Sequence, residues 1–181
     1  MSESSNAHQQ QATAQAKRQP VRCAILTVSD TRTIENDAGG ALIDRCLREA
    51  GHQPVDRAIV KDEPAQILDA VERWLMNPGI DAILITGGSG IGRRDTTIEV
   101  VRRLLTAELE GFGELFRMLS WQQVGAAAML SRAVAGLVSR SPEDGSDTFV
   151  FVMPGSPNAV ETAMENLIAP QLAHLVWERK R

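Results

Sequence analysis

The sequence has few of the residues that mark specialised classes of protein. Its 181 residues include two cysteines, three histidines and no tyrosine, and neither cysteine belongs to a CxxC or Cys/His pair. Cys23 lies in an apolar run and Cys46 in a helix-like segment, so we expect both to be reduced core residues. The histidines, at positions 8, 52 and 174, are scattered and give little support for a metal site or a catalytic triad.

Long apolar runs and a large net charge are also absent. No segment approaches the ~20 apolar residues that cross a bilayer, and the N-terminus shows no apolar secretory signal, which predicts a cytoplasmic protein without a membrane partner. The formal net charge is only -4, which favours no general binding to nucleic acid. Any anionic ligand must therefore be held by a local site.

The glycine-rich segment TGGSGIGRRD, residues 86–95, lacks the motifs of three common enzyme classes. It contains no GK[ST], which excludes a P-loop. Arg93 stands where GxGxxG requires its last glycine, and Ile91 breaks a GxSxG nucleophile motif. Dinucleotide-dependent oxidoreductases and serine hydrolases are therefore disfavoured.

The pattern that is present predicts one α/β domain. Residues 1–20 are polar and are predicted to form a disordered tail, which leaves residues 21–181 for the domain. Apolar runs and helical periodicity then alternate along the chain. The predicted strands are 23–28, 55–60, 82–85, 135–139 and 148–153, the last two forming a hairpin. The predicted helices are 37–50, 64–75, 96–105, a segment at 111–133 that is interrupted at Gly111, Gly113 and Gly125, and one after Pro157 with a kink at Pro170. Thr96 and Glu99 have the spacing of a capping box at the start of the third helix.

This alternation predicts a three-layer αβα sandwich with a mostly parallel, twisted sheet and one antiparallel edge strand from the hairpin. Ligands of such sheets bind beyond the carboxyl ends of the strands. Non-apolar loops follow four of the predicted strands, and we expect them to meet at one rim: Ser29 and Asp30, Lys61 and Asp62, residues 86–95, and residues 154–158.

Two of these loops are candidate anion sites. Thr86, Gly87, Gly88, Ser89 and Gly90 have the composition of a backbone amide cradle, with Arg93 and Arg94 beside it. A tight turn with no ligand explains the glycines equally well. The segment PGSPN at 154–158 is a weaker candidate by itself, because proline and glycine are ordinary turn residues between a strand and a helix.

Asp62 and Asp95 are the acidic candidates at this rim. Two carboxylates there could hold Mg2+ and bridge it to substrate phosphates. Helix capping is the alternative; it is the more common role for an aspartate placed like Asp62, and the two roles fit Asp95 about equally.

The segment 111–125 combines apolar residues, expected in the core or at a subunit interface, with polar ones. Glu114, Arg117, Ser131 and Arg132 are candidates for contact with a substrate. A solvated surface position or a structural ion pair is the more common role for each such residue.

Six segments occur in a characteristic order along nearly all of the chain after residue 20. They are AILTVSD at 24–30, AIVKDE at 58–63, LITGGSGIGRRDTTIE at 84–99, EGFGELFRMLS at 110–120, LSRAVAG at 130–136 and MPGSPNA at 153–159. Together these segments resemble the MoaB and MogA family of molybdenum cofactor biosynthesis proteins.

The resemblance implies a molybdopterin-binding domain that forms a homotrimer or homohexamer. It also implies a nucleotidyltransferase that uses Mg2+ and ATP and transfers AMP to the terminal phosphate of molybdopterin. An alternative is a noncatalytic protein that presents molybdopterin to other enzymes of the pathway. On the resemblance, the phosphate and pterin lie against the loop from Thr86 to Gly90 and against Pro154, Gly155, Ser156 and Pro157, with Ser29, Asp30, Arg93, Glu114 and Ser131 nearby, and Asp62 and Asp95 serve metal-assisted transfer.

Overall fold

A computed structural model describes residues 20–141 and 146–180. Nearly all of the predicted tail therefore lies outside the described residues, as does the centre of the predicted hairpin turn. Six strands form one sheet in the order β2-β1-β3-β6-β5-β4. Their bounds are β1 Arg22–Val28, β2 Gln53–Val60, β3 Ala82–Thr86, β4 Ala107–Glu108, β5 Val134–Ser141 and β6 Ser146–Met153.

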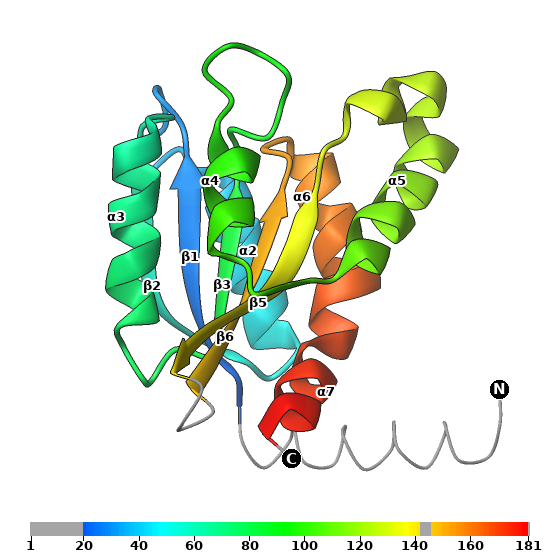
Figure 1. Cartoon of the computed structure of the whole chain (residues 1–181). Coiled ribbons are helices and arrows are strands. Elements are labelled where there is room, and N and C mark those ends of the chain that lie inside the picture. The colour runs from blue at the N-terminus through cyan, green and yellow to red at the C-terminus, as the bar shows by residue number, and fades with distance from the viewer. Residues whose placement is uncertain (1–19, 142–145, 181) are drawn as a thin grey trace, which may run out of the picture.

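The four strands β2, β1, β3 and β6 run parallel, and β5 runs antiparallel to β6. The predicted strands and hairpin are thus confirmed. Parallel strands that are covered on both faces need apolar side chains at every position, which explains the continuous runs in β1 and β3. Figure 1 shows the tips of β1 and β6 at the same edge of the molecule.

Helices cover both faces of the sheet, as the predicted three-layer sandwich requires (Figure 1). The helices α3 (Pro64–Leu75) and α4 (Thr97–Leu104) pack on one face. The other face is covered by α2 (Ala38–Glu49), α5 (Glu110–Val124), α6 (Pro157–Ala163) and α7 (Ala169–Lys180). Alternate residues of each strand serve the two cores, so Ile25 faces the second group of helices and Leu26 faces the first.

Cys23 and Cys46 are free and buried, as predicted. Burial raises the pKa of both thiols, with a smaller contribution from nearby acidic side chains. Within residues 20–141 and 146–180, every helix is too short or too polar to cross a bilayer.

The interrupted helical segment resolves into two elements. α5 runs without a break through Gly111 and Gly113, and the predicted interruptions at these two residues are wrong. Gly113 is buried against the carbonyl of Ala133, where a Cβ would lie 2.9 Å from that oxygen, so it serves close packing. Gly125, at φ +58, does end the helix, and the 3-10 helix η1 (Gly125–Leu130) follows.

The last helix contains a wide turn in addition to its proline. Between α6 and α7 lies the π-helical turn η2 (Met164–Ile168), and Pro170 is the second residue of α7. A proline lacks an N–H and crowds the carbonyl four residues earlier, here that of Asn166. A π turn directly before it relieves that conflict.

Candidate functional site

Two glycine-containing loops lie side by side at the carboxyl ends of β3 and β6. They are residues 86–95, called the glycine loop below, and residues 154–158. The Gly87 amide donates to Met153 O at 3.2 Å, and the Thr86 hydroxyl donates to Pro154 O at 3.1 Å. A Cβ on Gly155 would lie 3.2 Å from Gly87 Cα. The predicted convergence of residues 86–90 and 154–158 at one rim is therefore observed.

The end of β1 completes this contact. Gly87 has φ +96, and a Cβ there would lie 2.2 Å from Val28 O. A side chain at this position would meet both backbone strain and a direct clash. Glycine at 87 thus lets the three strand ends approach one another.

The glycine loop leaves a run of amides unused. In the described part of the chain, the N–H groups of Gly88, Ser89, Gly90 and Ile91 donate to no protein acceptor. Ser89 is buried, and Gly88 adopts φ +60, which turns the backbone sharply. Consecutive unpaired amides next to a helix start form an anion-binding arrangement.

Asp62 is fixed by the residue that precedes α4. The Thr96 amide and hydroxyl both donate to Asp62 Oδ1, at 3.1 and 3.0 Å. Asp62 therefore does not cap its own helix, whose N-cap residue is Glu63; it instead binds Thr96, the N-cap residue of α4. The capping box predicted from Thr96 and Glu99 is wrong, because Asp62 binds the Thr96 hydroxyl and Glu99 pairs with Arg132.

Asp95 folds back on the glycine loop. Its Oδ2 accepts from the Gly92 amide at 2.8 Å, and the same oxygen would lie 2.6 Å from a Cβ on Gly90. Asp62 Oδ2 and Asp95 Oδ1 accept no hydrogen bond within residues 20–141 and 146–180. Each carboxylate therefore keeps one oxygen that a bound group can use.

Thr97, the first residue of α4, contributes a buried hydroxyl beside Asp62. The residue is fully buried, and its Oγ1 has no hydrogen-bond partner in the described structure. A Cβ on Gly88 would lie 2.2 Å from this oxygen and 2.6 Å from Asp62 Oδ2. The absence of a side chain at position 88 thus leaves room for both the Thr97 hydroxyl and the Asp62 carboxylate beside the loop backbone.

The β1 loop is joined to the glycine loop by an exposed ion pair, in which Arg94 Nη2 lies 2.9 Å from Asp30 Oδ2. The Ser29 hydroxyl accepts from the amides of Thr31 and Arg32 and so shapes its own loop. Arg93 is exposed. The loop after β1 is therefore part of the rim, as predicted.

Arg132 also reaches the glycine loop. Its Nε donates to Ser89 O at 2.9 Å and its Nη2 to Gly90 O at 2.5 Å, while Nη1 pairs with Glu99 Oε1 at 2.5 Å. Ser131, next to it, is partly buried, whereas Glu114 is exposed on α5 and has no hydrogen bond to either loop among the described residues. Sequence reasoning included Arg132 only as one of several polar candidates.

One buried network near the rim was not predicted. Asp37, the N-cap of α2, accepts from the Gly40 amide, from the Thr27 hydroxyl at 2.7 Å and from Arg57 Nη2 at 2.6 Å. Burial alone would raise the pKa of Asp37, but these hydrogen bonds and the Arg57 charge keep that pKa below its usual value. An aspartate before Ala-Gly-Gly suggests an N-cap, so the sequence could have indicated the role of Asp37. Its pairing with Arg57 on β2 could not be predicted, because the two residues are twenty positions apart.

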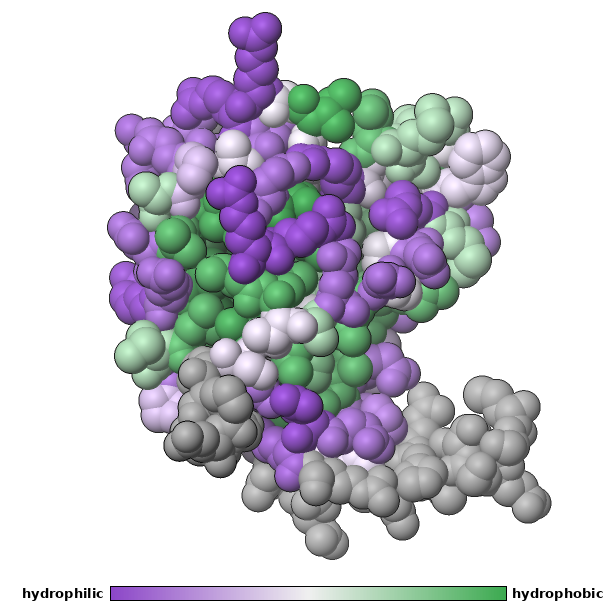
Figure 2. Space-filling view, viewed as in Figure 1, coloured by the Kyte–Doolittle hydropathy of each residue, from purple (hydrophilic) through white to green (hydrophobic). Residues whose placement is uncertain are grey.

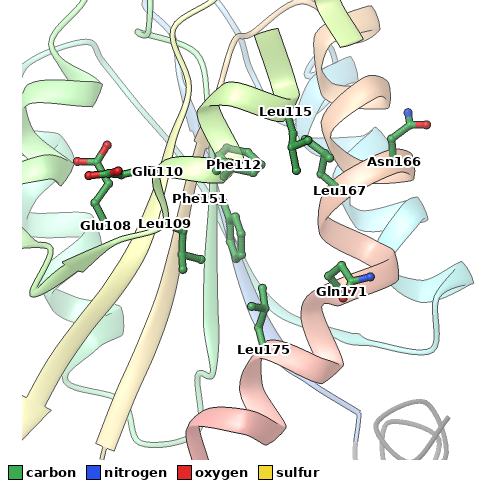
Figure 3. A pocket seen from close by; sticks show the side chains of 11 residues that line it. Glu108, Leu109, Glu110, Phe112, Leu115, Phe151, Asn166, Leu167, Gln171 and Leu175 are labelled. Carbon is green, nitrogen blue, oxygen red and sulfur yellow. The ribbon is translucent and has the colours of Figure 1, made fainter. Parts of the chain in front are cut away.

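A groove of about 720 Å³ lies elsewhere, between the start of α5 and the segment from η2 to α7 (Figure 3). Its walls are mainly apolar, including Phe112, Leu115 and Leu175. No residue of the two glycine loops lines it, so it is separate from the rim.

Comparison with known proteins identifies the family. Residues 24–174 match the family model described as "Probable molybdopterin binding domain". The molybdenum cofactor biosynthesis protein B of Bacillus cereus is 47% identical over 162 residues, which cover 89% of this chain and 92% of that protein. The chain belongs to this family. Protein B of Halalkalibacterium halodurans is 50% identical over 163 residues, 87% of this chain and 89% of its own.

Solved structures of the protein B family have the same fold. A crystal structure of molybdenum cofactor biosynthesis protein B matches with TM-score 0.84 and 46% identity, over 90% of this chain and 98% of that one. The tungsten cofactor synthesizing protein MoaB from Pyrococcus furiosus matches with TM-score 0.81 and 34% identity, over 90% of this chain and 99% of that one. These two solved structures thus share the fold described above.

Proposed function

We propose that this chain binds molybdopterin at the rim and transfers AMP from Mg-ATP to its terminal phosphate. The observation that carries the proposal is the run of four unpaired amides, Gly88 to Ile91, beside the loop of Gly155 and between two aspartates. The amides suit a phosphate. The choice of a pterin as ligand follows from the matched molybdopterin-binding family, and the pathway follows from the protein B relatives.

The acidic residues fit a divalent cation that is shared with substrate. No group of three or more His, Cys, Asp or Glu side chains that could hold a metal occurs among the described residues. Mg2+ characteristically uses one or two carboxylates and completes its shell with water and phosphate oxygens. The free oxygens of Asp62 and Asp95 would be the carboxylate ligands that the protein provides. The bound ion would neutralise phosphate charge during transfer.

The chain's own residues would act by position and charge. The terminal phosphate oxygen of molybdopterin attacks the α-phosphorus of ATP, a new P–O bond forms and the bond to pyrophosphate breaks. Such a transfer needs alignment and charge neutralisation, and no protein nucleophile. The loop amides hold the attacking phosphate, while Asp62 and Asp95 stay anchored through Thr96 and Gly92.

The decisive experiment incubates purified protein with molybdopterin, ATP and Mg2+ under anaerobic conditions and measures adenylylated molybdopterin and pyrophosphate. We expect both products in equal amounts. Molybdopterin binding without product would instead support the noncatalytic alternative, in which the protein presents the pterin to other enzymes of the pathway.

We also propose a homo-oligomer, a trimer or hexamer, as the family resemblance implies. In its support, α5 and η1 carry large apolar side chains that are about half exposed or more, a pattern typical of interaction surfaces. Figure 2 shows apolar colouring at the upper right, where Figure 1 places the end of α5 and η1. We call this set the α5 surface: Leu115, Met118, Trp121, Val124, Met129 and Leu130.

A further inference from the structure

Arg132 binds the glycine loop from its carbonyl side. Its guanidinium holds two consecutive carbonyls, those of Ser89 and Gly90. In a trans peptide the C=O and the following N–H point in opposite directions, and the described chain contains no cis peptide. The amides of Gly90 and Ile91 therefore point away from the guanidinium.

Glu99 on α4 holds the guanidinium in turn. Arg132 Nη1 lies 2.5 Å from Glu99 Oε1, and Nη2 lies 3.4 Å from Glu99 Oε2. The hydrogen bond from Arg132 lowers the pKa of Glu99, so this carboxylate remains charged at neutral pH. Only the planar fork of an arginine makes these contacts together, because a lysine presents a single nitrogen.

We infer that Arg132 is a positioning residue that orients the Gly90 and Ile91 amides for a phosphoryl oxygen of the ligand. The inference rests on the proposed function, because it takes the bound anion to be the terminal phosphate of molybdopterin. Arg132 acts through the loop, since its contacts go to Ser89, Gly90 and Glu99. Its charge is balanced by Glu99.

The test compares Arg132→Lys and Arg132→Gln with Arg102→Lys. Arg102 lies on α4 and pairs with Glu108 at 2.9 Å, so its substitution by lysine replaces the guanidinium of a similar ion pair that does not contact the loop. Molybdopterin affinity is measured by anaerobic equilibrium dialysis at a temperature at which thermal unfolding shows each variant to be folded. We expect both Arg132 variants to bind roughly tenfold more weakly, the effect of losing a charged hydrogen bond, and the Arg102 variant to bind like wild type.

The outcomes separate the inference from the proposed function. If wild type binds molybdopterin and Arg132→Lys binds equally well, positive charge alone suffices and the positioning role is overturned. If wild type does not bind at all, the proposed function itself fails. If the Arg132 variants do not fold, Glu99→Gln replaces them, because it releases one side of the guanidinium; unchanged binding in that variant also overturns the inference.

Discussion

Gly155 packs against Gly87 so closely that a Cβ on Gly155 would lie 3.2 Å from the Gly87 Cα, which joins the loop after β6 to the loop after β3. These two loops are separated by more than sixty residues of sequence. Their contact turns two ordinary strand-to-helix connections into one continuous surface. The rim therefore depends on glycine at position 87.

Gly87→Ala should lower the free energy of unfolding by roughly 2–4 kcal/mol, because it combines a strained φ with a clash against Val28 O. Gly51 is the matched control: its φ is +83, but nothing lies within 4 Å of its Cβ position. Gly51→Ala should therefore cost only about 1–2 kcal/mol. Urea unfolding measures both, and equal losses would show that the clash is relieved without cost.

Asp95→Asn should abolish turnover while molybdopterin remains bound. The amide keeps one oxygen for the Gly92 N–H but removes the negative charge needed for the cation. A loss of at least about a hundredfold in kcat is expected, on the scale of a lost electrostatic contact in a transition state. Undiminished product formation in this variant would refute the metal-binding assignment.

Thr97→Val should separate stability from function. The substitution removes a buried hydroxyl that has no partner among the described residues, so the free energy of unfolding should stay equal or rise by about 1 kcal/mol. If the hydroxyl serves a group bound beside Asp62, turnover should nevertheless fall, and Thr97→Ser should retain it. A Thr97→Val variant that is as active as wild type would show that Thr97 contributes only to packing.

Stability should fall as the solution becomes acidic, because of His52. Burial lowers its pKa below the ordinary value of 6.5, an effect that the backbone of Ala169 only partly offsets. The unfolded chain then takes up a proton at a higher pH than the folded chain does. The contribution of His52 to the free energy of unfolding is therefore constant above about pH 7.5 and declines below 6.5, by at most about 1.4 kcal/mol per pH unit. His52→Gln should give a flatter profile in urea unfolding at pH 7.5, 6.5 and 5.5.

Trp121→Glu should dissociate the proposed oligomer. Trp121 is 60% exposed in the middle of the α5 surface, and burying a carboxylate in an apolar contact is unfavourable. Met76, at the end of α3, is 82% exposed and lies outside that surface, so Met76→Glu is the control. Light scattering after size exclusion should show a smaller mass for the first variant alone; an unchanged mass would place the interface elsewhere.

The parallel core was predictable because its signal is local. The runs at β1, β3 and β6 are continuously apolar, and a strand buried on both faces allows little else. β4 was missed because Ala107 and Glu108 are exposed and too few to show a period. Its pairing with Gly136 and Leu137 is visible only in the folded chain.

The candidate site was predictable in its backbone and less so in its side chains. The glycines after β3 indicated where amides would be free, and the parallel order brought Gly155 beside Gly87. The contacts of Asp62 with Thr96 and of Arg132 with Ser89 join residues more than thirty positions apart. Distant pairs of this kind have no spacing rule, so one sequence does not predict them.

The reversed direction of β5 has a consequence for how the rim is built. Every parallel strand delivers only the segment that follows it to that edge, whereas β5 delivers the segment that precedes it. Arg132 therefore reaches the glycine loop from the segment before a strand, whereas the other parts of the rim follow strands. It comes two residues after η1, which together with α5 carries the α5 surface. A displacement of those helices would be transmitted over two residues to Arg132 and to the Ser89 and Gly90 peptide groups that it binds.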